Sequence, residues 1–258
     1  MTTYTTEIAS DKLISDNPIH QRLLKAYIAA IPLVGGDLLE VGCGEGRGVE
    51  VLINGVNSYH GMDKITQVIQ KLQSQFPKAS FEQAVIPPFL TLASNQFDTV
   101  VSFQVIEHIQ NDRLFLEEIY RVLKPGGKAI ISTPNISHTL SRNPWHIREY
   151  TGDQLMVLCE DIFDRVEAKG IGGNDKVWAY HSANRVSVNK ITRFDIFNLQ
   201  YRLPAALLRA PYEILNRINR NRLHKQQTIQ VEAITHEDYM VLDHPDKGLD
   251  LFYVLGKD

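Results

Sequence analysis

The sequence predicts an α/β fold built on a mostly parallel sheet with helices on both faces. From residue 37 to about 170, short apolar runs alternate with segments whose apolar residues repeat at helical spacing. The connections between these segments are short, and polar residues follow the ends of several runs. Such alternation favours a doubly wound sheet with right-handed crossovers. Ligands of these sheets bind beyond the carboxyl ends of the strands.

The individual elements follow from periodicity and from helix-stopping residues. The predicted strands are apolar runs at residues 37–41, 58–62, around 81, 97–103, 128–133, 163–168 and 249–255. The predicted helices lie within residues 18–31, 46–53, 65–72, 115–123 and 152–160. Gly170, Gly172 and Gly173 predict a turn after the sixth strand.

Composition limits the class of protein. The chain has 258 residues, 43% of them hydrophobic, and a net charge of −3, which is unlike a protein dedicated to nucleic-acid binding. Its two cysteines, Cys43 and Cys159, have no zinc-site spacing, and a reduced, cytoplasmic compartment is expected. The first 20 residues do not resemble a signal peptide, and no apolar run is long enough to span a membrane.

A glycine-rich turn follows the first predicted strand. Gly42, Gly44 and Gly46 alternate with other residues directly after Glu40-Val41 and before a helical pattern. Glycine permits positive φ and lets a ligand approach the backbone, while a helix start offers free N–H groups. A dinucleotide-binding G-x-G-x-x-G turn would need glycine where Arg47 stands. A tight turn without a ligand remains the alternative.

Asp63 ends the second predicted strand, 21 positions after Gly42. A carboxylate at this place suits the two hydroxyls of a ribose. The alternative is a helix N-cap, a role that Asp also favours.

Three further segments carry a family resemblance: FDTVVSFQVIEHI from Phe97, FLEEIYRVLKPGG from Phe115 and IISTPN from Ile130. With the glycine turn and Asp63, they resemble the class I S-adenosylmethionine (SAM)-dependent methyltransferases of the small-molecule and ubiquinone-biosynthesis type. The resemblance covers roughly residues 37–170. It implies a Rossmann-like, seven-stranded sheet whose last strand, 249–255, runs antiparallel beside 128–133, with a helical insertion before that strand.

The resemblance also implies a cofactor site for SAM, with S-adenosylhomocysteine as the product. Its residues are Glu40, Gly42, Cys43, Gly44, Gly46, Met62, Asp63, Gln83, Ala84, Phe103 and Gln104. Glu40 and the turn would hold the methionine part, together with the backbone near Gln104. Asp63 would hold the ribose, and Met62 or Lys64 would flank the adenine. Gln83 stands where many relatives have Asp.

Glu107 and His108 follow the fourth predicted strand. In some ubiquinone-pathway and RNA-end relatives, a Glu-x-x-Glu-His pattern binds a divalent metal, but here the first acid is Gln104. One carboxylate and one imidazole are few ligands for a hard cation, so no metal is expected. His108 could instead act as a general base, or the pair could cap and orient the helix that follows.

The loop Asn143–Tyr150 resembles a loop of many relatives. His146 is the preferred candidate base for O-methylation, and Trp145, Arg148 and Tyr150 are candidates for binding the methyl acceptor. The alternative is a structural loop in which Arg148 pairs with Glu149 or another acid.

Three parts are predicted: an N-terminal arm and helix at 1–36, a SAM-binding core at 37–173 and 248–258, and a helical insertion at 174–247. Within the insertion, residues 190–225 hold eight basic and two acidic residues, with apolar helical faces broken by Pro204 and Pro211. The insertion could be a lid over the acceptor, a basic surface for a membrane or lipid-linked substrate, or a packed helical pair at a homodimer contact.

The resulting prediction is an enzyme that moves a methyl group from SAM to a small molecule, at a hydroxyl oxygen, by in-line displacement. The alternatives are a methyltransferase acting on a lipid-linked or RNA substrate and a non-catalytic SAM-binding protein. A nicotinamide oxidoreductase is disfavoured by Arg47 and by the Gln-Val-Ile-Glu-His block. DNA is not an expected partner.

Overall fold

The computed structural model of the protein describes residues 13–226 and 228–258. Its centre is an eight-stranded sheet in the order β3-β2-β1-β4-β5-β8-β6-β7. The strands are β1 (Asp37–Val41), β2 (Ser58–Asp63), β3 (Ser80–Gln83), β4 (Phe97–Phe103), β5 (Leu123–Pro134), β6 (Arg165–Gly173), β7 (Tyr239–Leu242) and β8 (Asp250–Gly256). Neighbours from β3 to β5 pair in parallel, whereas β8 is antiparallel to both β5 and β6. The predicted mostly parallel sheet with an antiparallel last strand is confirmed, and β7 is an additional edge strand.

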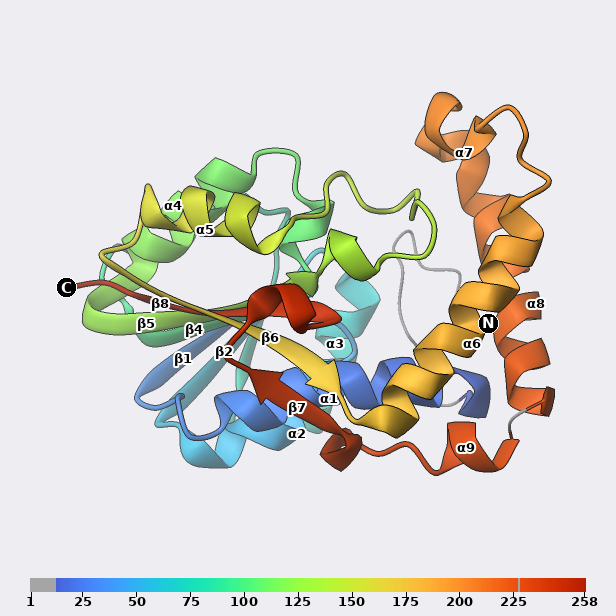
Figure 1. Cartoon of the computed structure of the whole chain (residues 1–258). Coiled ribbons are helices and arrows are strands. Elements are labelled where there is room, and N and C mark those ends of the chain that lie inside the picture. The colour runs from blue at the N-terminus through green and yellow to red at the C-terminus, as the bar shows by residue number, and fades with distance from the viewer. Residues whose placement is uncertain (1–12, 227) are drawn as a thin grey trace.

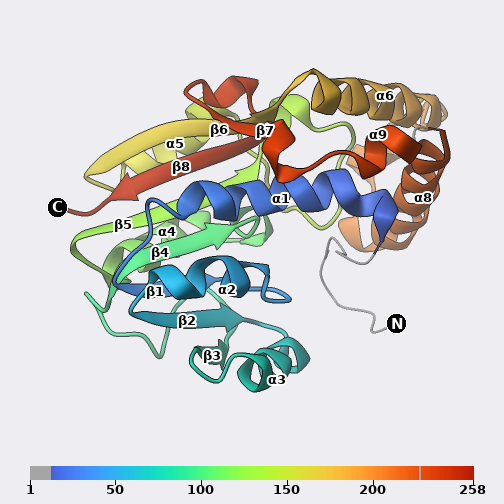
Figure 2. The same ribbon diagram turned by 90° about the horizontal axis from the view of Figure 1, so that it is seen from below.

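Helices cover both faces of the sheet (Figures 1 and 2). They are α1 (Asn17–Ala30), α2 (Arg47–Leu52), α3 (Thr66–Gln75), α4 (Asp112–Val122), α5 (Gly152–Glu160), α6 (Asp175–Thr192), α7 (Leu199–Arg202), α8 (Ala205–Gln226) and α9 (Thr228–Glu232). Among the described residues, no helix has both the length and the apolar character needed to cross a membrane. Of the N-terminal arm and helix predicted at 1–36, residues 1–12 lie outside the described residues.

Two hydrophobic cores lie on opposite faces of the sheet. Leu38 belongs to the core shared with α1, α2 and α3, and Leu39 to the core shared with α4 and α5. Both side chains are fully buried because successive side chains of a strand point to opposite faces. A central strand covered on both faces therefore appears in the sequence as an unbroken apolar run.

The turn predicted at Gly170, Gly172 and Gly173 is wrong, because these residues lie inside β6. They allow close packing instead. A Cβ atom on Gly170 would lie 3.0 Å from the carbonyl oxygen of Pro245, and one on Gly172 would lie 2.6 Å from Leu242. The glycines therefore let β6 approach the segment before β8 and the edge strand β7.

The helices of the insertion lie beyond the edge where the parallel strands end (Figures 1 and 2). Pro204 directly precedes α8, as a helix boundary should. The break predicted at Pro211 is wrong, because α8 continues through this residue. A proline inside a helix removes one backbone hydrogen bond, and the buried contact of Asn219 with α6 holds the later turns in place.

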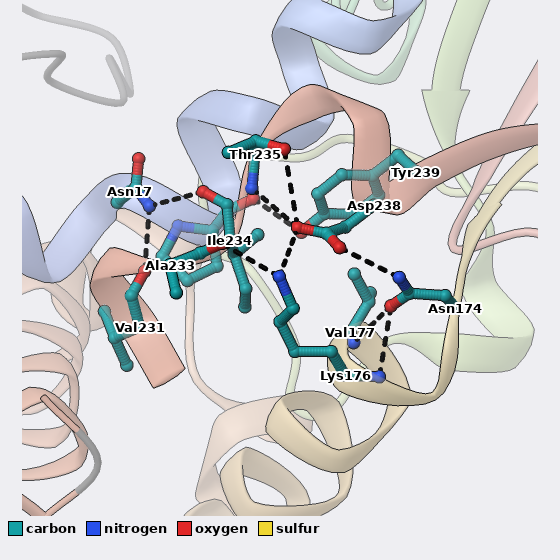
Figure 3. A network of polar contacts seen from close by, with 11 residues as sticks. Asn17, Asn174, Lys176, Val177, Val231, Ala233, Ile234, Thr235, Asp238 and Tyr239 are labelled. Atoms are coloured by element: carbon teal, nitrogen blue, oxygen red, sulfur yellow. Dashed lines mark hydrogen bonds and ion pairs between the residues drawn. The ribbon is translucent and has the colours of Figure 1, made fainter. Parts of the chain in front are cut away.

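Polar contacts fasten the end of the insertion to α1 and α6 (Figure 3). The amide of Asn17 donates to the carbonyls of Val231 and Ile234 at 2.8 and 2.9 Å. Lys176 Nζ lies 2.7 Å from Asp238 Oδ2. Burial acts to raise the pKa of Asp238, but the hydrogen bonds from Lys176 and from nearby amides outweigh it and lower the pKa to about 2. Asp238 therefore stays ionised and holds the start of α6.

A second fastening joins α8 to the residue before α1. The carboxylate of Asp16 is fully buried. It accepts hydrogen bonds from Arg217 at 3.0 and 3.1 Å and from Arg220 at 3.2 Å. Breaking a buried pair by removing one partner is strongly destabilising, so these arginines fix α8 over the strand ends.

Candidate functional site

The glycine turn between β1 and α2 has the backbone conformation that the sequence predicts. Gly42, Gly44 and Gly46 have φ values of +81°, +49° and +90°. Gly42 also has no room for a side chain, because a Cβ atom would overlap Val105. A Cβ atom on Gly44, in contrast, would meet nothing within 4 Å. The turn is thus packed on one side and open at Gly44, where a ligand can reach the backbone.

Asp63 joins this turn to the start of α3. Its Oδ2 accepts the Gly44 N–H at 3.0 Å, and its Oδ1 accepts the Ile65 N–H at 3.0 Å. The N-cap of α3 is Ile65 rather than Asp63, so the capping alternative does not describe this carboxylate. Each carboxylate oxygen has a second lone pair, and these suit the hydroxyls of a ribose.

Met62 contributes to the turn through its backbone. Its carbonyl accepts the N–H groups of Gly42 and Cys43 at 2.8 and 3.0 Å. Its side chain is fully buried in the core, which disfavours contact with an adenine, and the adenine role of Lys64 stays a prediction. Cys43 is also buried, which raises the pKa of its thiol and keeps it neutral. It too serves the turn through its backbone.

Glu40 is a buried acid at the end of β1, only 1% exposed. Its Oε1 accepts a 2.7 Å hydrogen bond from the Tyr27 hydroxyl, and its Oε2 is buried without a hydrogen-bond partner. Burial raises the pKa of Glu40 to about 8, the charge of Asp63 adds to this, and the Tyr27 hydrogen bond and Arg47 oppose it. An acid held in this state is poised to ionise when a cationic group arrives.

Gln104 follows β4 in a left-handed conformation, with φ +59°. Its N–H donates to the Ser132 carbonyl at 2.8 Å, which fixes the backbone there. Positive φ is uncommon for residues other than glycine, and such strain is concentrated at functional sites. At the ends of β2 and β3, the Gln83 side chain donates to the Lys64 carbonyl at 3.3 Å, and the Ala84 N–H donates to the Asp63 carbonyl at 2.9 Å.

Phe103, the last residue of β4, is buried. Its ring meets that of Tyr27 edge-on, with centroids 4.8 Å apart. This contact supports the residue that hydrogen-bonds Glu40. The residues predicted for the cofactor therefore converge on the ends of β1, β2, β3 and β4.

A polar cavity of about 260 Å³ lies beyond the ends of β4 and β5. It is bounded by α1, the loop at 134–149, α6 and α8. Gln104, Glu107, His108 and His146 are among its lining residues. Trp145, Arg148 and Tyr150 are not.

The two histidines of the cavity differ in their hydrogen bonds. Nδ1 of His108 lies 2.9 Å from the Trp145 carbonyl. A carbonyl can only accept, so we assign the proton to Nδ1, and Nε2 becomes the basic nitrogen. Nδ1 of His146 lies 2.6 Å from Glu149 Oε1, and its Nε2 lies 2.9 Å from the amide nitrogen of Asn143. The rings of His108 and His146 meet edge-on with centroids 5.0 Å apart.

Glu107 directly precedes His108 in the chain and is 1% exposed. Burial raises its pKa to about 7, while His146 and a 2.9 Å hydrogen bond from Thr133 oppose the shift. Glu107, His108 and His146 offer ligand atoms within 4.8 Å of one another. His146 could bind a divalent metal only by giving up a hydrogen bond to Glu149 or Asn143, whereas Glu107 has carboxylate lone pairs beyond the one that accepts from Thr133. Metal independence therefore stays a prediction.

The other residues predicted for the acceptor hold the loop in place. Arg148 donates to Asp112 at 2.6 Å and Tyr150 to the same carboxylate at 2.8 Å. The guanidinium of Arg209 lies 4.2 Å from the centre of the Trp145 ring. The alternative in which Arg148 pairs with Glu149 or another acid is confirmed with Asp112 as the acid, and this pair ties the loop to the start of α4.

Several residues of the cavity carry no signal that sequence reasoning could use. Arg22 Nε forms an ion pair with Asp250 Oδ2 at 3.2 Å. Neither Arg22 Nε nor the other carboxylate oxygen, Asp250 Oδ1, has a hydrogen-bond partner, and both are buried. His138 donates through Nε2 to the Asp246 carbonyl at 2.9 Å, which leaves its buried Nδ1 without a partner. Burial and nearby arginines lower the pKa of His181 to about 4, so it is neutral. Arg22, His138 and His181 are far apart in the sequence, so no local pattern indicates that they line one cavity.

Comparisons with known proteins find similarity to methyltransferases. A family model described as a methyltransferase domain matches residues 39–131. A Mycolicibacterium smegmatis protein named "Probable S-adenosylmethionine-dependent methyltransferase" is 28% identical over 84% of this chain and 78% of its own length. The Dictyostelium discoideum ubiquinone biosynthesis O-methyltransferase is 32% identical over 47% of this chain, which spans 39% of that protein. A solved Thermotoga maritima SAM-dependent methyltransferase shares the fold, with a TM-score of 0.59 at 13% identity, over 95% of this chain and 91% of that one.

Proposed function

We propose that the chain is a class I SAM-dependent methyltransferase, which the matching methyltransferase-domain model and the relatives support. We further propose that it methylates a hydroxyl oxygen of a small molecule bound in the polar cavity. The observation that carries the proposal is the state of His108. His108 lines the cavity together with Gln104, and the contact of its Nδ1 with the Trp145 carbonyl at 2.9 Å orients the ring there. An imidazole in this state can accept the proton of an acceptor hydroxyl.

The residues at the strand ends fit SAM as the methyl donor. SAM carries a sulfonium and an ammonium, and Glu40 offers a buried carboxylate oxygen without a partner. Gly44 gives open access to the turn, and Asp63 has lone pairs for the ribose hydroxyls. When bound, this cofactor supplies a methyl group already activated for displacement.

The protein then has two tasks. It holds the acceptor oxygen in line with the methyl carbon, and orientation of this kind contributes roughly 7–11 kcal/mol. It also removes the hydroxyl proton. His108 would take up that proton at Nε2, and bound SAM would supply the methyl group.

His108 replaces His146 as the preferred base. The side-chain oxygen of Asn143 accepts the Trp145 N–H at 3.0 Å, which identifies the other side-chain atom of Asn143 as the amide nitrogen. This nitrogen donates to Nε2 of His146. With both nitrogens of His146 engaged, we assign this ring to positioning His108, against which it packs. The O-methyltransferase name of the Dictyostelium relative supports oxygen as the acceptor atom. An RNA acceptor and a non-catalytic SAM-binding role remain the alternatives.

The proposal is tested with radiolabelled SAM and a panel of catechols and phenols. Wild-type protein should transfer label, and His108→Ala should lower kcat by about 10²–10⁴-fold while SAM binding, measured by calorimetry, is kept. His146→Ala should affect kcat less than His108→Ala does. Tight SAM binding with equal kcat in wild type and His108→Ala would refute the base assignment, and failure to bind SAM would refute the proposed function.

A further inference from the structure

A second cavity, of about 360 Å³, lies farther from the sheet, between α6, α8 and the segment that joins them. Its walls are largely apolar. They include Ile191, Phe194, Phe197, Leu208, Pro211 and Leu215. Water in such a cavity has few polar partners, so an apolar ligand would replace it favourably.

The two cavities adjoin. Ser141, Val188, Tyr212, Asn216 and Asn219 line both of them. The first cavity reaches Glu107 and His108, and the second reaches the phenylalanines of the segment 193–198. Together they form a path that is polar at the strand ends and apolar farther out.

Asn219, a polar residue at the junction, has its hydrogen bonds satisfied within the protein. Asn219 is only 5% exposed. Its amide nitrogen donates to Asn184 at 2.7 Å, and its amide oxygen accepts from Ser187 at 2.5 Å. An apolar chain that passes these groups therefore breaks no hydrogen bond of Asn219.

The apolar cavity also reaches the protein surface. Phe194 and Phe197 line it and are 73% and 64% exposed, and the neighbouring Ile196 is 78% exposed. Large apolar side chains left in water at the mouth of an apolar cavity mark a place where an apolar ligand enters.

We propose that the methyl acceptor is an amphipathic molecule, with its hydroxyl-bearing head in the polar cavity and an apolar chain in the second cavity. The proposal rests on the proposed function, and it names the substrate class of the same site. The apolar cavity holds on the order of ten methylene groups, if each takes about the 30 Å³ of a water molecule. Joined, the two cavities are in the size range of ligand sites.

The test compares catechol, 4-butylcatechol and 4-octylcatechol. We expect kcat/KM for methyl transfer, and the binding constant measured by calorimetry with S-adenosylhomocysteine present, to rise by two- to fourfold per buried methylene. Each compound is offered as a monomer in buffer and in phosphatidylcholine vesicles. A higher rate with monomers shows entry from water, and a higher rate with vesicles shows entry from a bilayer. Either result is in accord with the proposal when the rate increases with chain length.

Two adjacent residues of α8 give a matched pair of variants. Leu208 lines the apolar cavity, whereas Leu207 does not and is 64% exposed. Leu208→Gln should flatten the dependence of binding on chain length, and Leu207→Gln should leave it as in wild type. Equal slopes in the two variants would overturn the proposal.

The outcomes also separate this proposal from the proposed function. Binding that strengthens with chain length, without any methyl transfer, would refute the proposed function and keep the apolar site. Methyl transfer and binding that are both independent of chain length would overturn the inference and keep the function. Absence of binding by all three catechols would overturn the inference.

Discussion

Glu40 makes the stability of the ligand-free protein depend on pH in a way that a single substitution can reveal. Its folded-state pKa is about 8 against an ordinary value of 4.5, because the carboxyl is buried. The folded protein therefore binds the proton more tightly than the unfolded chain does. The stabilisation that this proton gives is fully present below pH 4.5 and is lost as the pH rises through 8.

The magnitude follows from the two pKa values. At about 1.4 kcal/mol for each pH unit between them, the loss is at most about 5 kcal/mol, of which about 3 kcal/mol falls between pH 5.5 and 8.5. Glu40→Gln cannot ionise and should lack this loss. The Gln side chain can still accept the Tyr27 hydroxyl, and the cost of its buried amide group is the same at every pH.

The assay is urea-induced unfolding without SAM at pH 5.5, 7 and 8.5. The free energy of unfolding of Glu40→Gln, relative to wild type, should increase by about 3 kcal/mol from the lowest to the highest pH. Glu107 also titrates in this range, but it is present in both proteins and cancels from the comparison. Tyr27→Phe serves as a second control, because it removes the hydrogen bond that opposes the shift and should steepen the pH dependence. Parallel pH profiles for wild type and Glu40→Gln would refute the buried-acid reasoning.

Three other expectations can be checked independently. Asp63→Ala should weaken SAM binding, measured by calorimetry, by at least tenfold, since a carboxylate that holds a ribose through charged hydrogen bonds contributes about 1.5–3 kcal/mol. An unchanged affinity for SAM would refute the assignment of Asp63 to the ribose. Asp238→Asn should lower the free energy of unfolding by about 1–3 kcal/mol at pH 7, because wild-type Asp238 is ionised there and paired with Lys176. The difference from wild type should shrink as the pH falls toward 2. Equal urea midpoints at pH 7 would contradict this expectation. Dialysis against EDTA should leave methyl transfer unchanged, and loss of activity that Mg²⁺ or Zn²⁺ restores would show that the group Glu107, His108 and His146 binds a metal.

The central sheet could be predicted from the sequence because its strands are covered on both faces. Leu38 and Leu39 are both fully buried, so β1 appears as an apolar run, and β4 is found with its predicted bounds. The edge strand β7 is also an apolar run, Tyr239–Leu242, but it has only four residues, two of them exposed, and it lies within the segment predicted as a helical insertion.

The incorrect turn predicted at Gly170, Gly172 and Gly173 has a different cause. A local sequence pattern cannot distinguish a glycine needed for a turn, such as Gly42 with φ +81°, from one needed for close packing, such as Gly170. The first requires a backbone conformation, which the flanking residues help to specify. The second depends on Pro245, which lies 75 positions later in the chain.

The two halves of the site differ in the same way. The predicted cofactor residues follow strand ends, and parallel strands bring their ends to one edge, so their convergence follows from the order of elements. The polar cavity is lined from α1, α6, α8 and the loop after β5, so its residues could not be grouped from local signals. Arg148 and Tyr150 have the right chemistry for binding a ligand, but Asp112 binds both of them.

Gln104 is, among the described residues, the one shared by the predicted cofactor site and the lining of the acceptor cavity. Under the proposed function, its left-handed backbone lies between the methyl donor and the methyl acceptor. Any rearrangement of this peptide on binding one ligand changes the surface offered to the other. The affinities for methyl donor and acceptor should then be thermodynamically linked, and linkage of this kind is reciprocal. A substitution at Gln104 would therefore change the cooperativity between the two substrates as well as each separate affinity.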